Sequence, residues 1–217
     1  MSFKQIALDG PAGSGKSTVA KLLAKKLNFT FINSGGFFRA IALYIKQNNI
    51  DYQNLSSEQL KNILEKVEIH QVGEHFFLNN EDVTDKIHNS EISSIVPIIA
   101  KIPVVREYAT KLQVDMANKT DIVIEGRDTT TVMFPNATLK CWVFANPKIR
   151  AERRWEQEGK KQSLDEVFKE LVIRDKLDTE RDVSPMKRAD DAFDVDTSNI
   201  TIDECVEKIA NEFATRI

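Results

Sequence analysis

Cysteine and histidine are scarce in this chain of 217 residues. The two cysteines, Cys141 and Cys205, stand far apart, and neither they nor the three histidines have the spacing of a zinc-ligand set. Cys141 lies within an apolar run, which favours a buried packing residue over a reactive thiol. The sequence therefore predicts no zinc centre.

Uninterrupted apolar runs are also missing. The run at 95–105 is broken by Pro97, Lys101 and Pro103, so it is too short and too interrupted to span a bilayer. The first five residues lead directly into the apolar segment Ile6–Leu8, and we expect no signal peptide there. A reducing cytoplasm is the expected location, and no membrane partner is expected.

A large excess of one charge is absent as well. The net charge of −3 gives no bulk attraction to nucleic acid or to an anionic membrane surface. With 41% hydrophobic and 29% charged residues, the composition is that of an ordinary globular protein, and the length suits one domain with a small insertion. An anionic substrate must therefore be held by cations placed locally, and nucleic acid is not an expected partner.

Short apolar segments alternate with amphipathic ones along most of the chain. We predict strands at 6–8, 29–32, 122–125, 139–144 and 192–196, with helices between them and after the last. Apolar strands that cannot face water imply an α/β fold, a parallel sheet covered by helices on both faces. Residues 67–85 alternate around Gly73 instead, which predicts a small antiparallel insert. In the helix opened by Ser163, one apolar side is expected: Leu164, Val167, Phe168, Leu171 and Val172.

The segment GPAGSGKST matches the phosphate-binding pattern G-x-x-x-x-G-K-[ST], between a predicted strand and a predicted helix. Its glycines let backbone N–H groups surround an anion, and the helix N-terminus adds unpaired donors. Lys16 can reach the β- and γ-phosphates of a nucleotide, and the Ser17 hydroxyl can ligate Mg²⁺. The segment predicts binding of a nucleoside triphosphate with Mg²⁺ by nine residues, and the family resemblance described below makes that nucleotide ATP: Gly10, Pro11, Ala12, Gly13, Ser14, Gly15, Lys16, Ser17 and Thr18.

Arginines recur at helical spacing after this loop. Arg150, Arg153 and Arg154 stand at i, i+3 and i+4, and Arg174 is followed by Asp178 and Arg181. Alone, such sets are typical of a solvated helix face. With a phosphate loop in the same chain they indicate phosphoryl transfer, because that chemistry requires positioning and neutralisation of charge. The candidate catalytic residues are Lys16, Arg150, Arg153, Arg154 and Arg174.

In order along the chain, from about residue 3 to 212, these motifs resemble bacterial cytidylate kinases of the P-loop nucleoside monophosphate kinase superfamily. A G-R-D motif followed by a T-V-x-F-P run is more specific than the phosphate loop. The segments that carry the resemblance are Ile6–Ser17, Ser34-Gly35 with Arg39, Pro103–Glu107, Glu125–Asp128, Val132–Pro135, and Arg174–Asp178 with Arg181 and Ser184-Pro185.

The resemblance implies in-line transfer of the ATP γ-phosphoryl group to CMP or dCMP, with Mg²⁺, by a monomeric enzyme. It assigns cytosine recognition to Ser34, Arg106 and Asp128, because a hydroxyl, a guanidinium and a carboxylate match the edge of that base. It assigns the sugar hydroxyls to Asp178. The CMP-binding residues implied are Ser34, Arg39, Arg106, Arg127, Asp128, Arg174, Asp178 and Arg181.

The resemblance also implies a division of the chain. Residues 1–217 form a single kinase domain, within which 35–118 bind the nucleoside monophosphate and carry the insert at 67–85. Residues 148–182 are implied to form a mobile lid that excludes water from the site.

The chain departs from the family pattern at several positions, among them Asn33 and Gly36, which stand where the family usually has aspartate and alanine. Phe38 replaces a tyrosine, Thr130 replaces a glycine, and His88 replaces a common arginine. If that glycine had a positive φ, Thr130 would be strained.

Two alternative functions remain at this point. One is a kinase for UMP, AMP or a non-nucleotide acceptor, and the other is a nucleotide-dependent switch. The guanine-reading pattern N-K-x-D of regulatory GTPases occurs at Asn118–Asp121, but before a predicted strand instead of after one. We therefore interpret it as the end of a helix.

Overall fold

The computed structural model describes residues 3–217, so the expectation for Met1 and Ser2 lies outside the described residues. The chain forms two compact units. Unit 1 combines the N-terminal segment up to Phe31 with Thr120–Ile217, and unit 2 is Ile32–Lys119. Unit 2 has nearly the same bounds as the range 35–118, for which binding of the nucleoside monophosphate remains a prediction.

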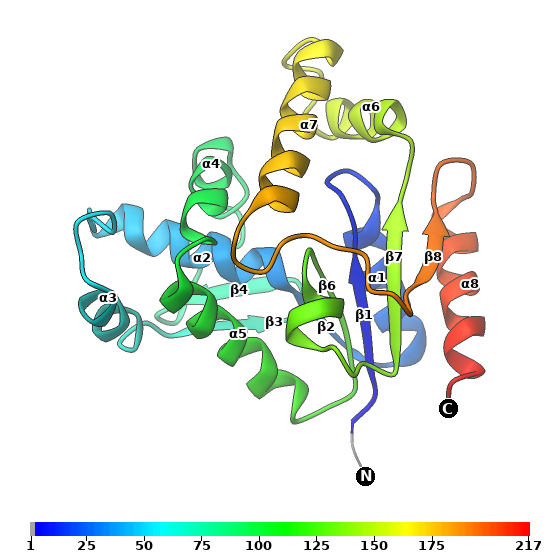
Figure 1. The fold of residues 1–217 in the computed structure, drawn as a ribbon, viewed down its shortest axis with the longest axis horizontal. Helices are drawn as coiled ribbons and strands as arrows, with labels where there is room; N and C mark the ends of the chain where they lie inside the picture. Colours follow the sequence, from blue (N-terminus) through cyan, green and yellow to red (C-terminus); the bar gives the residue numbers. More distant parts are fainter. Residues whose placement is uncertain (1–2) are drawn as a thin grey trace. The chain divides into compact units, whose positions relative to one another are not determined.

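Unit 1 is built on a five-stranded parallel sheet flanked by helices, with the strand order β2-β6-β1-β7-β8 (Figure 1). Its strands are β1 (Gln5–Asp9), β2 (Thr30–Asn33, which continues into unit 2), β6 (Ile122–Gly126), β7 (Leu139–Phe144) and β8 (Phe193–Asp196). Its α-helices are α1 (Lys16–Leu27), α6 (Pro147–Gln157), α7 (Leu164–Glu180) and α8 (Ile202–Ala214). The predicted parallel α/β fold is confirmed.

The core of unit 1 lies where α1 and α8 pack against the sheet. Consecutive residues of the central strands are buried, because both faces of the sheet are covered. Cys141 is among them, as predicted, and its burial raises the pKa of the thiol. The apolar side of α8 completes this core, and a capping box of Thr201 and Glu204 fixes where that helix begins.

Unit 2 combines helices with the predicted antiparallel insert. Its strands β3 (Ile69–Val72), β4 (His75–Leu78) and β5 (Glu81–Asp82) form a three-stranded sheet. Its helices are α2 (Ser34–Gln47), α3 (Ser57–Leu64), α4 (Ser90–Ile99) and α5 (Pro103–Ala117). The start of α2 lies close to β4: a Cβ placed on Gly36 would be 2.0 Å from the ring of Phe76. The insert is thus packed on the helix that begins with Ser34.

One turn was not predicted, and one predicted apolar position is wrong. Residues Thr129–Met133 form a π-helical turn, η1, which their run of threonines did not indicate. Val172 was expected on the apolar side of α7 but is 44% exposed. The seam between α6 and α7 is narrow, so it takes up Val167 and Leu171 but not a residue five positions after Val167.

The structure also bears on the N-K-x-D pattern, on the backbone of Thr130 and on membrane-spanning helices. Asn118 ends α5, so the N-K-x-D pattern is the end of a helix as interpreted. Thr130 does not have a positive φ, and the strain considered for it is absent. Among residues 3–217, no helix is both long and apolar enough to cross a membrane.

Candidate active site

The loop between β1 and α1 has a backbone that only glycine permits. Gly10 has a φ of 152°, and a Cβ there would lie 1.9 Å from the carbonyl oxygen of Val143 in β7. Gly15 has a φ of 83° and immediately precedes α1. The first-turn N–H groups of α1 lack intrahelical partners and point toward this loop, which is the arrangement that binds phosphate.

Lys16 is buried within a group of cations. Its side chain is almost fully covered, and Nζ donates to the carbonyl oxygen of Pro11 at 3.0 Å. Burial and the positive charges of Arg127 and Arg174 lower the pKa of Lys16 to about 7, although Glu125 and Asp9 act in the opposite direction. Three cations in one region therefore repel each other, and a bound polyanion would relieve that repulsion.

Arg150 and Asp175 hold the loop at Ala12. The N–H of Ala12 donates to Asp175 Oδ1 at 2.9 Å, and Arg150 Nη1 donates to the carbonyl oxygen of Ala12 at 2.8 Å. Arg150 Nη1 and Asp175 Oδ2 are 2.6 Å apart, with both side chains largely buried. The Ala12 side chain packs in the apolar cluster between α6 and α7. We call Ala12, Arg150 and Asp175 the Ala12 latch.

The other two arginines of α6 have separate partners. Arg153 donates to the Thr197 hydroxyl at 2.9 Å and to the Thr197 carbonyl oxygen at 2.6 Å. The Thr197 hydroxyl donates in turn to the carbonyl oxygen of Ser14 at 2.9 Å, so Arg153 supports the loop indirectly. Arg154 pairs with Glu158 one turn further along α6. The three guanidinium groups thus share no partner, and their catalytic roles remain predictions.

Beyond the end of β6, two arginine–carboxylate pairs join the segment after that strand to the last turn of α7 and to Arg181, the residue that follows the helix. Arg127 Nε donates to Asp178 Oδ2 at 3.0 Å. Arg181 Nη2 donates to Asp128 Oδ1 at 2.9 Å, and both of these side chains are 6% exposed. Four of the predicted CMP-binding residues are therefore brought together in unit 1. The Asp128 side chain does not cap the η1 turn that follows it.

In unit 2, the predicted residues lie at the starts of two helices. Ser34 is the first residue of α2 and is buried, but the helix is capped by Asn33, whose Oδ1 accepts from the N–H of Gly36 at 3.1 Å. Arg106, in the first turn of α5, donates to the carbonyl oxygen of Ala100 at 3.1 Å, and its guanidinium lies 5.5 Å from the ring centre of Phe38. Phe38 thus supports Arg106 by a cation–π contact, for which no tyrosine hydroxyl is needed.

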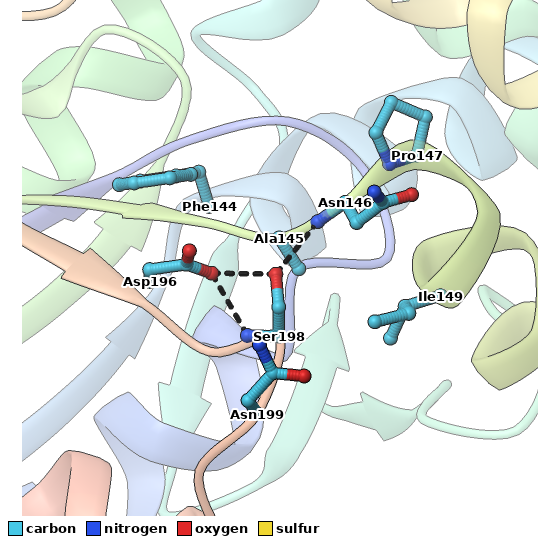
Figure 2. Close-up of a pocket in the computed structure, with 8 residues that line it drawn as sticks. All are labelled: Phe144, Ala145, Asn146, Pro147, Ile149, Asp196, Ser198 and Asn199. Carbon is cyan, nitrogen blue, oxygen red and sulfur yellow. Dashed lines mark hydrogen bonds between the residues drawn. The ribbon is translucent and has the colours of Figure 1, made fainter.

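A pocket of about 420 Å³ opens at the ends of β7 and β8 (Figure 2). The Asp196 carboxylate accepts from the N–H and hydroxyl of Ser198, and the Ser198 oxygen accepts from the N–H of Asn146 at 2.9 Å. The Ser198 hydroxyl lowers the pKa of Asp196. The pocket is lined by Phe144, Ala145, Asn146, Pro147, Ile149, Asp196, Ser198 and Asn199.

Sequence reasoning missed three residues that support the site: Asp9, Asp175 and Thr197. Asp9 and Asp175 lie inside two segments that carry the family resemblance, Ile6–Ser17 and Arg174–Asp178, but no role was predicted for either. Their presence in those segments was the available signal, whereas the residues that they contact lie far away in the sequence.

Comparison with known proteins assigns the family. The model of the family described as Cytidylate kinase matches residues 6–215. The chain belongs to the cytidylate kinase family.

Curated relatives bearing the cytidylate kinase name cover almost the whole chain. The protein from Fusobacterium nucleatum is 40% identical over 210 residues, which is 95% of each chain. The protein from Fervidobacterium nodosum is 42% identical over 208 residues, which is 94% of each chain. Membership of the cytidylate kinase family makes this chain a nucleotide kinase.

Solved structures that share less than 20% sequence identity with this chain are similar to it in fold, and that similarity shows the fold alone. A crystal structure of an uncharacterized protein from Eubacterium ventriosum has a TM-score of 0.56 at 13% identity, covering 98% of this chain and 99% of that one. A Thermus thermophilus structure has a TM-score of 0.53 at 16% identity, covering 100% and 99%.

Proposed function

We propose that this chain transfers the γ-phosphoryl group of ATP to CMP and dCMP, forming the diphosphates, with Mg²⁺. The observation that carries the proposal is the group of cations beside the phosphate loop. Lys16 is close enough to Arg127 and Arg174 for their charges to depress its pKa. Such repulsion is useful where the phosphates of two substrates meet, because the transferred group spreads negative charge over its oxygens. Family membership supports the acceptor.

The residues present suit ATP and Mg²⁺. Among residues 3–217, no group of three or more acidic, histidine or cysteine side chains could hold a metal ion. Mg²⁺ bound with a nucleotide needs few protein ligands, since phosphate oxygens and water supply the rest. The exposed Ser17 hydroxyl at the start of α1 would hold the ion, which would neutralise phosphate charge. Gly10–Thr18 would hold the phosphates through backbone N–H groups and Lys16.

Recognition of the acceptor in unit 1 is proposed for the two buried pairs at the end of β6. Asp128 is held by Arg181 and would accept a hydrogen bond from the cytosine amino group, whereas uracil presents a carbonyl oxygen that a carboxylate repels. Asp178, held by Arg127, would accept from the sugar hydroxyls. Arg174 and Arg181 would bind phosphate and sugar oxygens.

For unit 2 we propose the roles that the resemblance implies. Ser34 and Arg106 would bind the cytosine edge, and Arg39 would bind the acceptor phosphate. The contact between Arg106 and the Phe38 ring supports this, because it fixes the direction of the guanidinium group. No strong general base is required, since the phosphate oxygen of CMP is already a nucleophile.

Residues 148–182 are proposed to act as a lid. They include α6 from its second residue onward and the whole of α7, two helices that pack against each other. Closure would exclude water that otherwise accepts the phosphoryl group, and would bring Arg150, Arg153 and Arg154 to their proposed catalytic roles. We also propose that the protein is a monomer, that it works in the cytoplasm, and that its substrates are small molecules only.

Initial rates with CMP, dCMP, UMP and AMP at fixed MgATP test the proposal. We expect CMP and dCMP to be the preferred acceptors. A faster rate with UMP or AMP would assign a different kinase activity. Consumption of ATP that no acceptor stimulates would instead favour a nucleotide-dependent switch.

Substitution of Asp128 tests base recognition directly. We expect Asp128→Ala to lower the preference for CMP over UMP by about 10- to 100-fold, the range expected for loss of a directed contact to a base edge. Asp128→Asn is the matched variant, because its amide can donate to the uracil carbonyl, and it should shift preference further toward UMP. Equal losses for both acceptors in both variants would contradict base recognition at this residue.

A further inference from the structure

The carboxylate of Asp9 is completely buried at the end of β1. Its Oδ1 accepts from the N–H and the hydroxyl of Thr129 at 3.0 and 2.8 Å. Its Oδ2 accepts from the N–H and the hydroxyl of Thr130, both at 2.7 Å. Burial raises the pKa of Asp9, and these four hydrogen bonds oppose that shift. Both oxygens are therefore engaged by one turn of the chain.

The turn that Asp9 holds is the one that follows the G-R-D motif. Asp9 is opposite Gly126 in the β1–β6 ladder, and Arg127 and Asp128 stand between Gly126 and Thr129. The carbonyl oxygen of Asp128 accepts from the N–H of Val132 at 3.0 Å, inside η1. The turn directly after Asp128 is thus anchored twice, by the backbone hydrogen bond of η1 and by the hydrogen bonds of Thr129 and Thr130 to Asp9.

The hydroxyl of Thr130 belongs to this chain's own version of the motif. Thr130 takes part without a strained backbone, because its φ is not positive. Its hydroxyl adds a hydrogen bond to a buried carboxylate, and bonds to charged groups are about twice as strong as neutral ones. A residue without that hydroxyl would leave Oδ2 with the Thr130 N–H alone.

We propose that Asp9, Thr129 and Thr130 are positioning residues that set the placement of Arg127 and Asp128 for the acceptor nucleotide, with the Thr130 hydroxyl as a determinant of CMP specificity. The inference rests on the proposed function. Asp9 itself is held in the sheet between Gly126 and Trp142. Loss of a threonine hydroxyl should therefore loosen the turn after β6, while the phosphate loop that follows Asp9 keeps its place.

The test compares three threonine variants in the full chain. Thr130→Val removes the hydroxyl at nearly constant volume, and Thr130→Ser retains it. Thr131→Val is the matched control, since the Thr131 hydroxyl is buried without a hydrogen-bond partner among the described residues. For each variant, KM for CMP, KM for ATP, kcat and the CMP-to-UMP preference are measured, together with the unfolding midpoint.

We expect Thr130→Val to raise KM for CMP about tenfold, the scale of a hydrogen bond to a charged group, and to lower the CMP-to-UMP preference. KM for ATP should stay within about twofold, since the loop is unaffected. Thr130→Ser and Thr131→Val should behave like the parent. Should Thr130→Val fail to fold, Thr129→Val removes the hydroxyl on the other oxygen and carries the same expectation.

Several outcomes would overturn the inference. These are an unchanged KM for CMP with only a lower unfolding midpoint, a parallel rise of both KM values, or a Thr130→Ser variant as impaired as Thr130→Val. Failure of this inference can be distinguished from failure of the proposed function by assaying the unsubstituted enzyme. If the proposed function is wrong, CMP does not stimulate ATP consumption by the unsubstituted enzyme.

Discussion

The depressed pKa of Lys16 predicts that ATP binding takes up a proton. At pH 8, a lysine with a pKa of about 7 is about 90% neutral in the free enzyme. Bound phosphates favour the charged form, so Lys16 must gain its proton as ATP binds. We expect an uptake of about 0.9 protons per MgATP at pH 8, falling to about 0.5 at pH 7.

The same linkage fixes the direction of the pH dependence. Above pH 7 Lys16 is increasingly deprotonated in the free enzyme and must be protonated when the nucleotide binds. The affinity for MgATP therefore falls as pH rises. If the pKa in the complex returns well above 8, the dissociation constant for MgATP should be about fivefold larger at pH 8 than at pH 7.

Titration calorimetry measures the uptake when binding is repeated in buffers of different ionisation enthalpy. The slope of the observed enthalpy against buffer ionisation enthalpy is the number of protons exchanged. Lys16→Arg is the matched control, because a guanidinium group retains its charge at every pH of interest and should abolish the slope. A slope near zero at pH 8 in the parent, or the same slope in Lys16→Arg, would refute the reasoning.

Two further predictions concern stability. Asp175→Asn leaves the buried guanidinium of Arg150 without its charged partner, so the free energy of unfolding measured in urea titrations should fall by about 3–5 kcal/mol. The control is Asp165→Asn, at an exposed position in the same helix, which should change the free energy of unfolding by less than about 1 kcal/mol. Equal effects of the two substitutions would show that the Ala12 latch does not contribute to stability. Gly36→Ala gains about 1 kcal/mol of helix propensity but places a Cβ 2.0 Å from the buried Phe76 ring, and overpacking costs about 1–3 kcal/mol. We therefore expect a net loss that Phe76→Leu partly restores, and a rise in the thermal unfolding midpoint of Gly36→Ala would count against this packing argument.

Features that depend on neighbouring residues in the sequence could be predicted, whereas features that depend on tertiary packing could not. The phosphate loop depends on residues within a few positions of each other, and so do the capping boxes that the structure shows at Ser56, Ser163 and Thr201. The prediction for Val172 was wrong and no role was predicted for the threonines after Asp128, because both depend on what packs beside them. Periodicity indicates an apolar side of a helix but not how much of that side a neighbour covers.

The sequence by itself determined the parallel α/β architecture, the phosphate loop and the family, since each rests on short-range spacing or on motifs in order. Only the tertiary structure decided which charges meet. Arg127 and Asp178 are 51 positions apart, Asp128 and Arg181 are 53 apart, and Asp9 lies 120 positions before Thr129. Such pairs are created when β6 is placed beside β1 and α7 returns to the ends of those strands. Each of these charged side chains is largely or completely buried and therefore needs a hydrogen-bonding partner, because a charge removed from water is costly without one. The local sequence does not specify which residue that partner is.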